Sequence, residues 1–510
     1  MARLFEYQGK KLLSGNKIAI PKGRVCESPE EVAETMAELG GRAVIKAQVW
    51  TTKRAEWGGI RFVQSFDEAS RAAAELLGKQ VGQFQVERLL VEEVLESVRE
   101  LYAGVIVDDA VRAPVMIFSS MGGTGIEEIA ETHPESVAKV TIDLDSGLLP
   151  FQARDLCRRA GLESRWHVKV ADLLVKLYKT ARQVEARTAE INPIMITKSG
   201  HIVAADCRIT VDDYAVFRHP ELEIEIAREL DRPPTHLDRV AYDVEKDDYR
   251  GTFYFIQMNQ GFKRGDRFVG FHGAGGGGSM MSMDALTQYN FKIADFTDTS
   301  GNPPASKVYR AARIILSQHG IDGYFASGSG VASQEQFHSA RGLVKAFREV
   351  PLKVPAVIRL GGNSEERAIQ IITDYTRDLN VPVEGYGKDD SPDFCAERLD
   401  SLVKETPEPV SEKPVAWTRR DAARPYQFET ITGRVQFDHD LCARCENKVC
   451  IVDCVPQILM LNDEGLPVLN ITPEEAKKGK CTECLACEVE CFFHGNKGGY
   501  IDLPIPGLDD

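Results

Sequence analysis

The chain has 510 residues, which is enough for several domains because a single hydrophobic core seldom grows past about 250 residues. Hydrophobic residues make up 43% and charged residues 27%, a composition that excludes a disordered chain. A net charge of −15 disfavours nucleic acid and anionic membranes as partners, so we expect neither. No apolar run approaches the ~20 residues of a membrane helix, and MARLFEYQGKKLL lacks the apolar core of a signal peptide. The expected location is therefore cytoplasmic.

Sequence patterns divide the chain into four segments. Residues 1–240 mix helical spacing, as in SPEEVAETMAELG, with short apolar runs such as AVIKAQV and LYAGVIVDD. Residues 241–404 alternate strand, glycine turn and helix, which predicts a parallel sheet with crossover helices. Residues 405–429 are rich in proline and charge, as is typical of an interdomain linker. The remaining segment, 430–510, is a compact cysteine-rich module.

Lys46 ends a predicted strand, where its ammonium could reach a nucleotide phosphate, although a lone lysine in that position is more often a solvated surface residue. Glu190 lies two residues before Asn192, and residues two apart on a strand share a face. Glu190 and Asn192 can therefore address one site.

Several motifs in the first segment together resemble one family. These are LFEYQGKKLL, AVIKAQV, RELYAGVIVDD, MGGTGIEEIAETHPESVAKVTID, AEINPIMIT and AADCRI. In this order they closely resemble the β subunit of succinyl-CoA synthetase, an ATP-grasp protein among the ADP-forming acyl-CoA ligases. The likeness covers most of residues 1–230 and continues more weakly to about 385. It implies an α/β chain, with an ATP-grasp domain followed by a flavodoxin-like CoA-ligase domain and, here, a small α+β ferredoxin domain.

The resemblance also implies roles for individual residues. Lys46 would reach a phosphate or the adenine edge of ATP (or GTP), Glu92 would lie near the ribose and adenine hinge, and Glu100 would be a second carboxylate on the nucleotide side. Asn192 and Asp206 match the magnesium ligands, and their amide and carboxylate oxygens are the hard ligands that Mg²⁺ prefers. Glu190 matches a catalytic carboxylate that faces the phosphorylated histidine of a partner subunit.

The chain departs from the family at the loop that covers the phosphates. Where the family has Gly-Gly-Arg-Gly, this chain reads Trp50-Thr-Thr-Lys53-Arg54-Ala-Glu-Trp-Gly-Gly59. Glycines serve such loops because the backbone must approach phosphate closely, and Thr, Lys and Ala obstruct that approach. Lys53 and Arg54 either grip the phosphates by their side chains, or the chain has lost efficient phosphoryl transfer.

The acid-binding side is altered as well. In VGFHGAGGGGSMMSMDAL, His272 replaces an asparagine of the family's substrate side. The glycine run could hold a phosphate on free N–H groups, although close packing is its commoner cause. In GYFASGSGVAS, only Gly330 and Val331 match the family's Asn-Ile-Phe-Gly-Gly-Ile-Val motif. Succinate is therefore doubtful as the acid.

None of the ten histidines falls in the family's phosphohistidine motif. We therefore expect a hetero-oligomer, with an α-like partner subunit that supplies the phosphorylatable histidine and binds CoA.

Eight of the 12 cysteines lie in the last segment and form two groups. The first group is Cys442, Cys445, Cys450 and Cys454, and the second is Cys481, Cys484, Cys487 and Cys491. In two-cluster ferredoxins the fourth cysteine of each group ligates the other cluster. This rule assigns Cys442, Cys445, Cys450 and Cys491 to one [4Fe-4S] cluster, and Cys481, Cys484, Cys487 and Cys454 to a second.

Three alternatives compete with two clusters. A structural zinc ion would leave four cysteines unexplained, and disulfides are disfavoured in a cytoplasmic chain. A single surviving cluster is the more serious alternative, because the first group has a four-residue gap and lacks a proline after Cys454. The segments FDHDLCARCENKVCIVDC and CTECLACEVEC resemble ferredoxin-like proteins that serve electron-transferring flavoprotein:quinone oxidoreductases. That likeness implies a redox partner, either a flavoprotein or an iron–sulfur protein.

Two functions from different classes follow. The first is the β-like subunit of an ADP-forming acyl-CoA synthetase with a fused electron-transfer domain. The second is an electron-transfer or scaffold subunit of an acyl-CoA-linked oxidoreductase, whose ATP-grasp body is degenerate. ATP turnover that gates electron delivery would combine the two.

Overall fold

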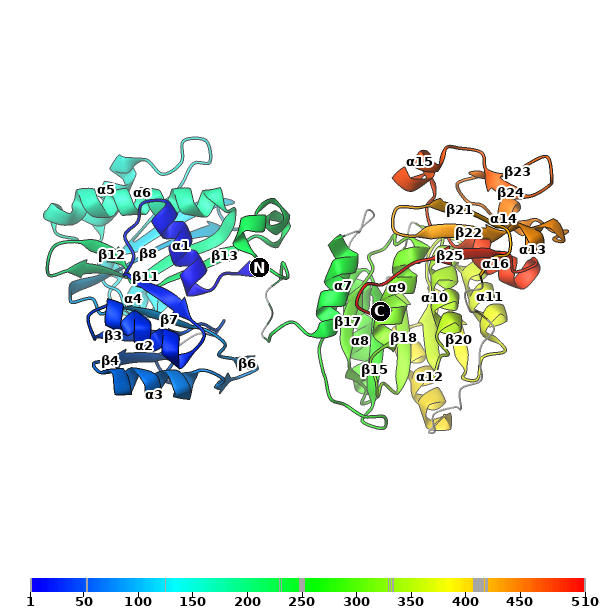
Figure 1. Ribbon diagram of the computed structural model, residues 1–510, viewed down its shortest axis with the longest axis horizontal. Coiled ribbons are helices and arrows are strands. Elements are labelled where there is room, and N and C mark those ends of the chain that lie inside the picture. Colours follow the sequence, from blue (N-terminus) through cyan, green and yellow to red (C-terminus); the bar gives the residue numbers. More distant parts are fainter. Residues whose placement is uncertain are drawn as a thin grey trace. The chain divides into compact units, whose positions relative to one another are not determined.

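The computed structural model describes residues 2–51, 54–123, 125–228, 230, 232–246, 253–328, 330, 332, 334–406, 417 and 421–508. The chain forms two compact mixed α/β units, Met1–Pro233 and Pro234–Asp510 (Figure 1). The boundary predicted after residue 240 falls inside helix α7 (His236–Lys246). Among the described residues, no helix is long and apolar enough to cross a membrane.

The larger sheet of the first unit has seven antiparallel strands, in the order β1-β13-β11-β8-β9-β10 with β12 beside β11. Its strands are β1 (Ala2–Arg3), β8 (Ser97–Asp108), β9 (Ala113–Ser119), β10 (Val137–Thr141), β11 (Ala186–Thr197), β12 (Ile202–Ala204) and β13 (Cys207–Val211). Helices α1 (Glu6–Gly15), α5 (Pro150–Arg159) and α6 (His167–Gln183) pack on it. The apolar stripes of these helices and the inward strand residues share one core.

A second, four-stranded sheet in this unit has the order β2-β7-β3-β4. Its elements are β2 (Gly23–Cys26), α2 (Pro29–Glu38), β3 (Ala43–Ala47), β4 (Ile60–Val63), α3 (Phe66–Leu76) and β7 (Leu89–Glu93). Ser28 and Ser65 accept backbone N–H groups at the starts of α2 and α3, which fixes where both helices begin. Shorter elements complete the unit: β5 (Gln80–Val81), β6 (Phe84–Gln85), α4 (Ile126–Thr132), η1 (Pro134–Ser136), η2 (Ser164–Trp166), η3 (Asp213–Arg218) and η4 (Pro220–Leu222).

The second unit is built on a seven-stranded sheet of order β14-β17-β15-β18-β19-β20, with β16 beside β15. All pairings except the antiparallel edge strand β14 are parallel, as the alternation of strand, glycine turn and helix predicts. The strands are β14 (Tyr254–Gln257), β15 (Phe268–Ala274), β16 (Lys292–Ile293), β17 (Asp295–Asp298), β18 (Gly323–Gly328), β19 (Ala356–Arg359) and β20 (Val383–Tyr386). Helices α8 (Gly276–Gln288) and α12 (Pro392–Glu405) pack together, and α7, α9 (Ala305–Leu316), α10 (Phe337–Glu349) and α11 (Glu365–Thr376) form another layer.

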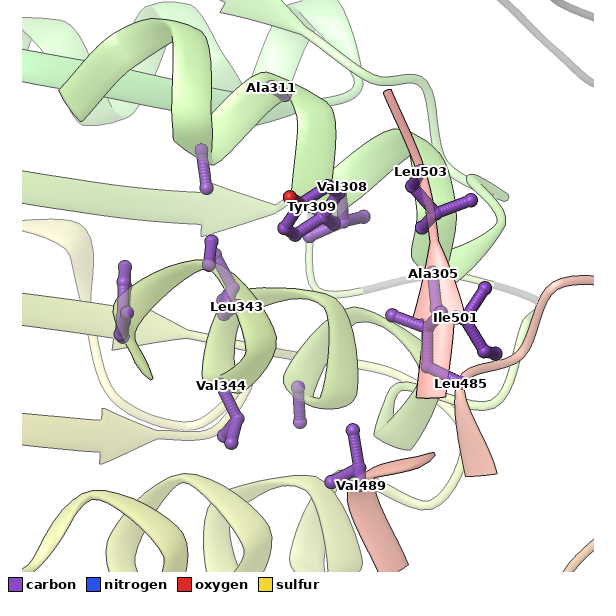
Figure 2. Close-up of a cluster of buried hydrophobic side chains, with 14 of the residues drawn as sticks. Ala305, Val308, Tyr309, Ala311, Leu343, Val344, Leu485, Val489, Ile501 and Leu503 are labelled. Atoms are coloured by element: carbon purple, nitrogen blue, oxygen red, sulfur yellow. The ribbon is translucent and has the colours of Figure 1, made fainter. Parts of the chain in front are cut away.

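The cysteine-rich module belongs to this same unit. Its elements are β21 (Pro425–Glu429), β22 (Arg434–Asp438), α13 (His439–Ala443), α14 (Val449–Val452), β23 (Leu459–Leu461), β24 (Pro467–Leu469), α15 (Pro473–Glu475), the π-helical turn η5 (Ala476–Lys480), α16 (Ala486–His494) and β25 (Gly499–Asp502). Figure 2 shows its Leu485, Val489, Ile501 and Leu503 beside Ala305, Val308 and Leu343 of α9 and α10. The module therefore shares a continuous core with the parallel-sheet domain.

Buried ion pairs reinforce this contact. The Arg341 guanidinium of α10 lies 2.8 Å from a Glu490 oxygen, and Lys345 Nζ lies 2.8 Å from Glu488. The Tyr375 ring stacks on Phe493 at 3.8 Å between centroids. Of the predicted linker 405–429, residues 407–416 and 418–420 lie outside the described residues, and residues 425–429 form β21.

Replacing Arg341 tests the contact. Arg341→Ala leaves the Glu490 carboxylate buried without its cation, which typically costs about 3–5 kcal/mol. We expect a markedly lower melting temperature for the second unit, followed by thermal unfolding under anaerobic conditions. The control Arg377→Ala breaks an exposed pair with Asp374 and should shift stability by less than about 1 kcal/mol. Equal melting of the two variants would contradict the argument.

Candidate functional site

Four of the predicted nucleotide-side residues converge in the first unit. Lys46 stands on β3, Glu92 on the neighbouring strand β7, Arg54 in the loop between β3 and β4, and Asp206 just before β13. The sequence reasoning missed two residues that complete the group, Glu6 and Lys10 of α1. The six side chains form one network, which we call the charge network. Glu6, Lys10, Lys46 and Glu92 are buried in it, and Arg54 and Asp206 are partly exposed.

Two ammonium groups of the charge network hold the backbone next to Asp206. Lys46 Nζ lies 2.8 Å from a Glu6 oxygen and 2.9 Å from a Glu92 oxygen, and it donates to the carbonyl of Ala205 at 2.6 Å. Lys10 Nζ donates to Glu92 at 2.5 Å and to the same Ala205 carbonyl at 2.8 Å. The carbonyl of Ala205 is therefore clamped from two sides, which fixes the start of β13.

Arg54 joins the network from the loop that departs from the family pattern. Its guanidinium lies 2.8 Å from Glu6 and 2.7 Å from Asp206, and it donates to the carbonyl of Ala47 at 3.2 Å. Three cations thus face three carboxylates. Buried charges are tolerated when they are paired and hydrogen-bonded, so this balance explains how the group survives in the interior.

Burial and neighbouring charge set the protonation states. Burial alone would raise the pKa of Glu6, but Lys46, Lys10 and Arg54 hold that pKa well below its usual value. Burial would lower the pKa of Lys46, but Glu6, Asp206 and Glu92 raise it. The pKa of Asp206 is raised by burial and by Glu6, against the opposing pull of Arg54. Glu6 and Lys46 therefore stay charged. Asp206 takes up a proton more readily than Glu6 does.

The two predicted magnesium ligands lie next to each other. The Asn192 N–H donates to the Asp206 carbonyl at 3.2 Å, so β11 and the start of β13 bring both side chains to one place. The Asn192 side-chain oxygen accepts the N–H of Gly123 at 3.0 Å. An amide oxygen beside a carboxylate suits a hard divalent cation. The donor set therefore fits Mg²⁺.

Glu190 and Glu100 lie near the Asn192–Asp206 pair. Glu190 is partly buried, and its pKa is raised by burial, with Glu127 and Asp206 adding to the effect and Arg208 opposing it. Glu100 on β8 pairs with Met195 of β11, and its carboxylate lies beside Gly123. Both predicted carboxylates are therefore close to the Asn192 side of the site.

The missed residues left a weak signal in the sequence. Glu6 and Lys10 are four residues apart on α1, on the same buried face as Leu13. A charged pair on the apolar stripe of a helix indicates oppositely charged partners in other parts of the chain, but it does not identify those residues. Gly9 lies between the two and lets α1 approach β13 closely, since a Cβ there would be 2.7 Å from the Cys207 sulfur.

The predicted residues of the second unit are placed differently. His272 on β15 is buried, and its ring bonds the Tyr324 hydroxyl at 2.6 Å and the Thr299 hydroxyl at 3.2 Å. Burial lowers the pKa of His272 to about 3, so the ring is neutral. Gly330 has a positive φ of 77° and lies beside Arg359 and Lys388. Val331 and Lys53 lie outside the described residues.

The eight clustered cysteines line two separate cavities. Cys442, Cys445, Cys450 and Cys491 line one cavity, and Cys454, Cys481, Cys484 and Cys487 line the other. This division is the same as the crossed assignment predicted from spacing. Burial, with added repulsion from neighbouring thiolates, raises the pKa of Cys442 and of Cys450 to about 12. Within the described chain, no three His, Cys, Asp or Glu side chains are grouped as a site for a single metal ion.

Comparison with known proteins identifies the family. Residues 3–196 match the model of the ATP-grasp domain. The chain is 35% identical over 369 residues to the β subunit of the GDP-forming succinate–CoA ligase of Thermus thermophilus, covering 72% of this chain and 93% of that protein. The chain belongs to the succinate–CoA ligase β-subunit family. Another family member, the ADP-forming β subunit 2 of Archaeoglobus fulgidus, is 34% identical over 378 residues, covering 74% of this chain and 93% of that protein.

A solved structure supports the fold of this family member. The ATP citrate lyase of Methanothrix soehngenii, solved with citrate and coenzyme A, aligns with a TM-score of 0.65 at 19% identity. The alignment covers 79% of this chain and 99% of that one. At this identity the likeness concerns the fold alone, a mixed α/β ATP-grasp fold.

Neutralising Glu6 tests the charge network. Glu6→Gln leaves three cations facing two carboxylates in the interior, and breaking a buried pair typically costs about 3–5 kcal/mol. We expect a clear fall in the melting temperature of the first unit by calorimetry. The matched control Glu34→Gln removes an exposed partner of Arg24 and should change stability by less than about 1 kcal/mol. If Glu6→Gln melted like Glu34→Gln, the network would not be a structural constraint.

Proposed function

We propose that the chain is the β-like subunit of an ADP-forming acid–CoA ligase. In this reaction an organic acid, ATP and CoA give acyl-CoA, ADP and phosphate. The observation that carries the proposal is the adjacency of Asn192 and Asp206 to the buried ammonium of Lys46. The proposal is further supported by relatives whose names describe succinate–CoA ligase β subunits.

The chain's own residues would divide the work as follows. Asn192 and Asp206 would hold Mg²⁺, which when bound neutralises phosphate charge. The Lys46 ammonium lies between the Glu6 and Glu92 carboxylates, and from there it would contact the nucleotide. Arg54 would have to release the Asp206 carboxylate before a metal ion could bind there, because Arg54 and the ion would compete for the Oδ2 oxygen. Glu190 would face the phosphorylated histidine of the partner subunit.

A partner subunit completes the site in this proposal. The α-like partner would bind CoA and carry the phosphorylated histidine. Succinate is not the acid that we expect, since His272 is enclosed by Tyr324 and Thr299 and the segment around Gly330 differs from the family's motif. Organic acids other than succinate are the first to test.

We further propose that the module carries two [4Fe-4S] clusters. The support is the division of eight cysteines between two cavities, four in each, in the pattern of a two-cluster ferredoxin. The module would then exchange electrons with a flavoprotein or an iron–sulfur protein.

The scaffold alternative is less favoured. It requires an ATP-grasp body without nucleotide binding, whereas the charge network and the Asn192–Asp206 pair keep the side chains that such binding uses. Titration calorimetry with Mg·ATP separates the two functions, because a scaffold should take up no nucleotide.

Asp206→Asn tests the ligase function. Losing the carboxylate removes one of two protein ligands of the metal ion, so Mg·ATP-dependent thioester formation by the complex with its α-like partner should fall at least about 100-fold. Asp155→Asn, which changes an exposed carboxylate paired with Arg158, should retain full activity. Unchanged turnover in Asp206→Asn would refute the assignment.

Cys491→Ser and Cys454→Ser test the cluster assignment. Protein purified without oxygen should hold about eight iron and eight sulfide atoms per chain if two cubanes are present. Each substitution should lower the iron content by up to about half and change a different cluster's electron paramagnetic resonance signal. Cys395→Ala, at a buried cysteine far from both cavities in sequence, should leave iron and sulfide unchanged. Colourless, iron-free wild-type protein would end the proposal.

A further inference from the structure

A second cavity in the first unit lies apart from the charge network. It has a volume of about 420 Å³, within the range of small-molecule sites. It opens where β8 ends and β11 begins, between the last turn of α6 and η3. Along β11, Arg187 in its wall precedes Asn192 by five residues, about 16 Å at the rise of a strand. The cavity is therefore separate from the predicted metal site.

The inner wall of this cavity is apolar. Val105 and Val107 of β8, Pro114 of β9 and Ala181 of α6 contribute aliphatic surface. Tyr178 adds the face of a mostly buried ring. Tyr214 stands at the wall with 84% of its surface exposed. Such a wall favours a hydrocarbon or aromatic body over a bare inorganic ion.

The rim of the cavity is cationic. Arg182, Arg187 and Arg218 all line it. Two carboxylates lie beside them: Glu185 pairs with Arg218, and Asp212 accepts the backbone N–H of Tyr214 at 2.9 Å and keeps its negative charge. The rim therefore has three guanidinium groups and two carboxylates.

Two of the three arginines are available to a ligand. Arg187 contacts Asp109 at 3.4 Å, but that carboxylate is 85% exposed, and exposed pairs contribute little. No ion pair of Arg182 is found in the part of the chain that the structure describes. A guanidinium binds carboxylate and phosphate oxygens in pairs, so Arg182 and Arg187 suit one anionic group.

We propose that this cavity binds a small organic anion, with its apolar body against Val105, Val107 and Tyr178 and its anionic group between Arg182 and Arg187. The inference does not depend on the proposed ligase activity, because none of the lining residues belongs to the charge network. Carboxylates and phosphate monoesters share the required chemistry.

The test is binding of four probes to the full-length chain, measured by titration calorimetry and ligand-observed magnetic resonance. Benzoate and phenyl phosphate distinguish the two anionic groups. Benzamide lacks the charge, and inorganic phosphate lacks the apolar body. At least one of the first two should bind at least about tenfold more tightly than either control probe. Saturating Mg·ATP should leave that binding unchanged.

Variants locate the binding. Arg182→Gln with Arg187→Gln should weaken the bound probe at least about tenfold. Ala186→Phe, which fills the wall and keeps every charge, should do the same. The control Arg158→Gln changes an exposed arginine of α5 and should bind as wild type. Circular dichroism checks that each variant is folded. The proposal is overturned if neither benzoate nor phenyl phosphate binds, if the variants bind as wild type, or if Mg·ATP displaces the probe.

Discussion

The charge balance among Glu6, Lys10, Lys46, Arg54, Glu92 and Asp206 constrains the whole first unit. These side chains come from a helix, two strands and two loops, and they can be buried only as a set. Removing one leaves an opposite charge stranded at low dielectric, where an unpaired ion is far more costly than in water. The network therefore ties α1, β3 and β7 to the start of β13. It also fixes Asp206 beside Asn192, which is the feature on which the proposed chemistry depends.

Part of this arrangement could be predicted from the sequence. The motifs around Lys46, Asn192 and Asp206 predicted the nucleotide side, and the helix starts at Ser28 and Ser65 follow from local hydrogen bonding. Glu6 and Lys10 escaped notice because their partners lie 40 to 200 residues away, at Lys46, Glu92 and Ala205. Periodicity shows which face of a helix is buried, but not what it meets. The burial of His272 was hidden for the same reason, since Tyr324 lies on the neighbouring strand β18 and Thr299 directly follows the neighbouring strand β17.

The attachment of the cysteine module was also beyond the sequence. Proline and charge in residues 405–429 predicted a linker, yet the module packs on α9 and α10 through apolar contacts (Figure 2). The Arg341–Glu490 and Lys345–Glu488 pairs add to this contact. Arg341 and Lys345 are four residues apart on α10, and this spacing alone does not indicate that both side chains are buried. Because Glu488 and Glu490 lie between Cys487 and Cys491 on α16, the helix that carries one cysteine of each predicted cluster set is anchored to the parallel-sheet domain. A module fixed in this way would keep its clusters at a constant position relative to that domain.

Asn192 and Asp206 are proposed to form a metal–nucleotide site. The most direct measurement is a crystal structure of the chain with Mn²⁺ and a non-hydrolysable ATP analogue, using the anomalous scattering of manganese to locate the ion. We expect an anomalous peak within coordination distance of the Asn192 and Asp206 side-chain oxygens, and phosphate density near Lys46. Nucleotide density at another place, or an ion bound away from both residues, would contradict the claim.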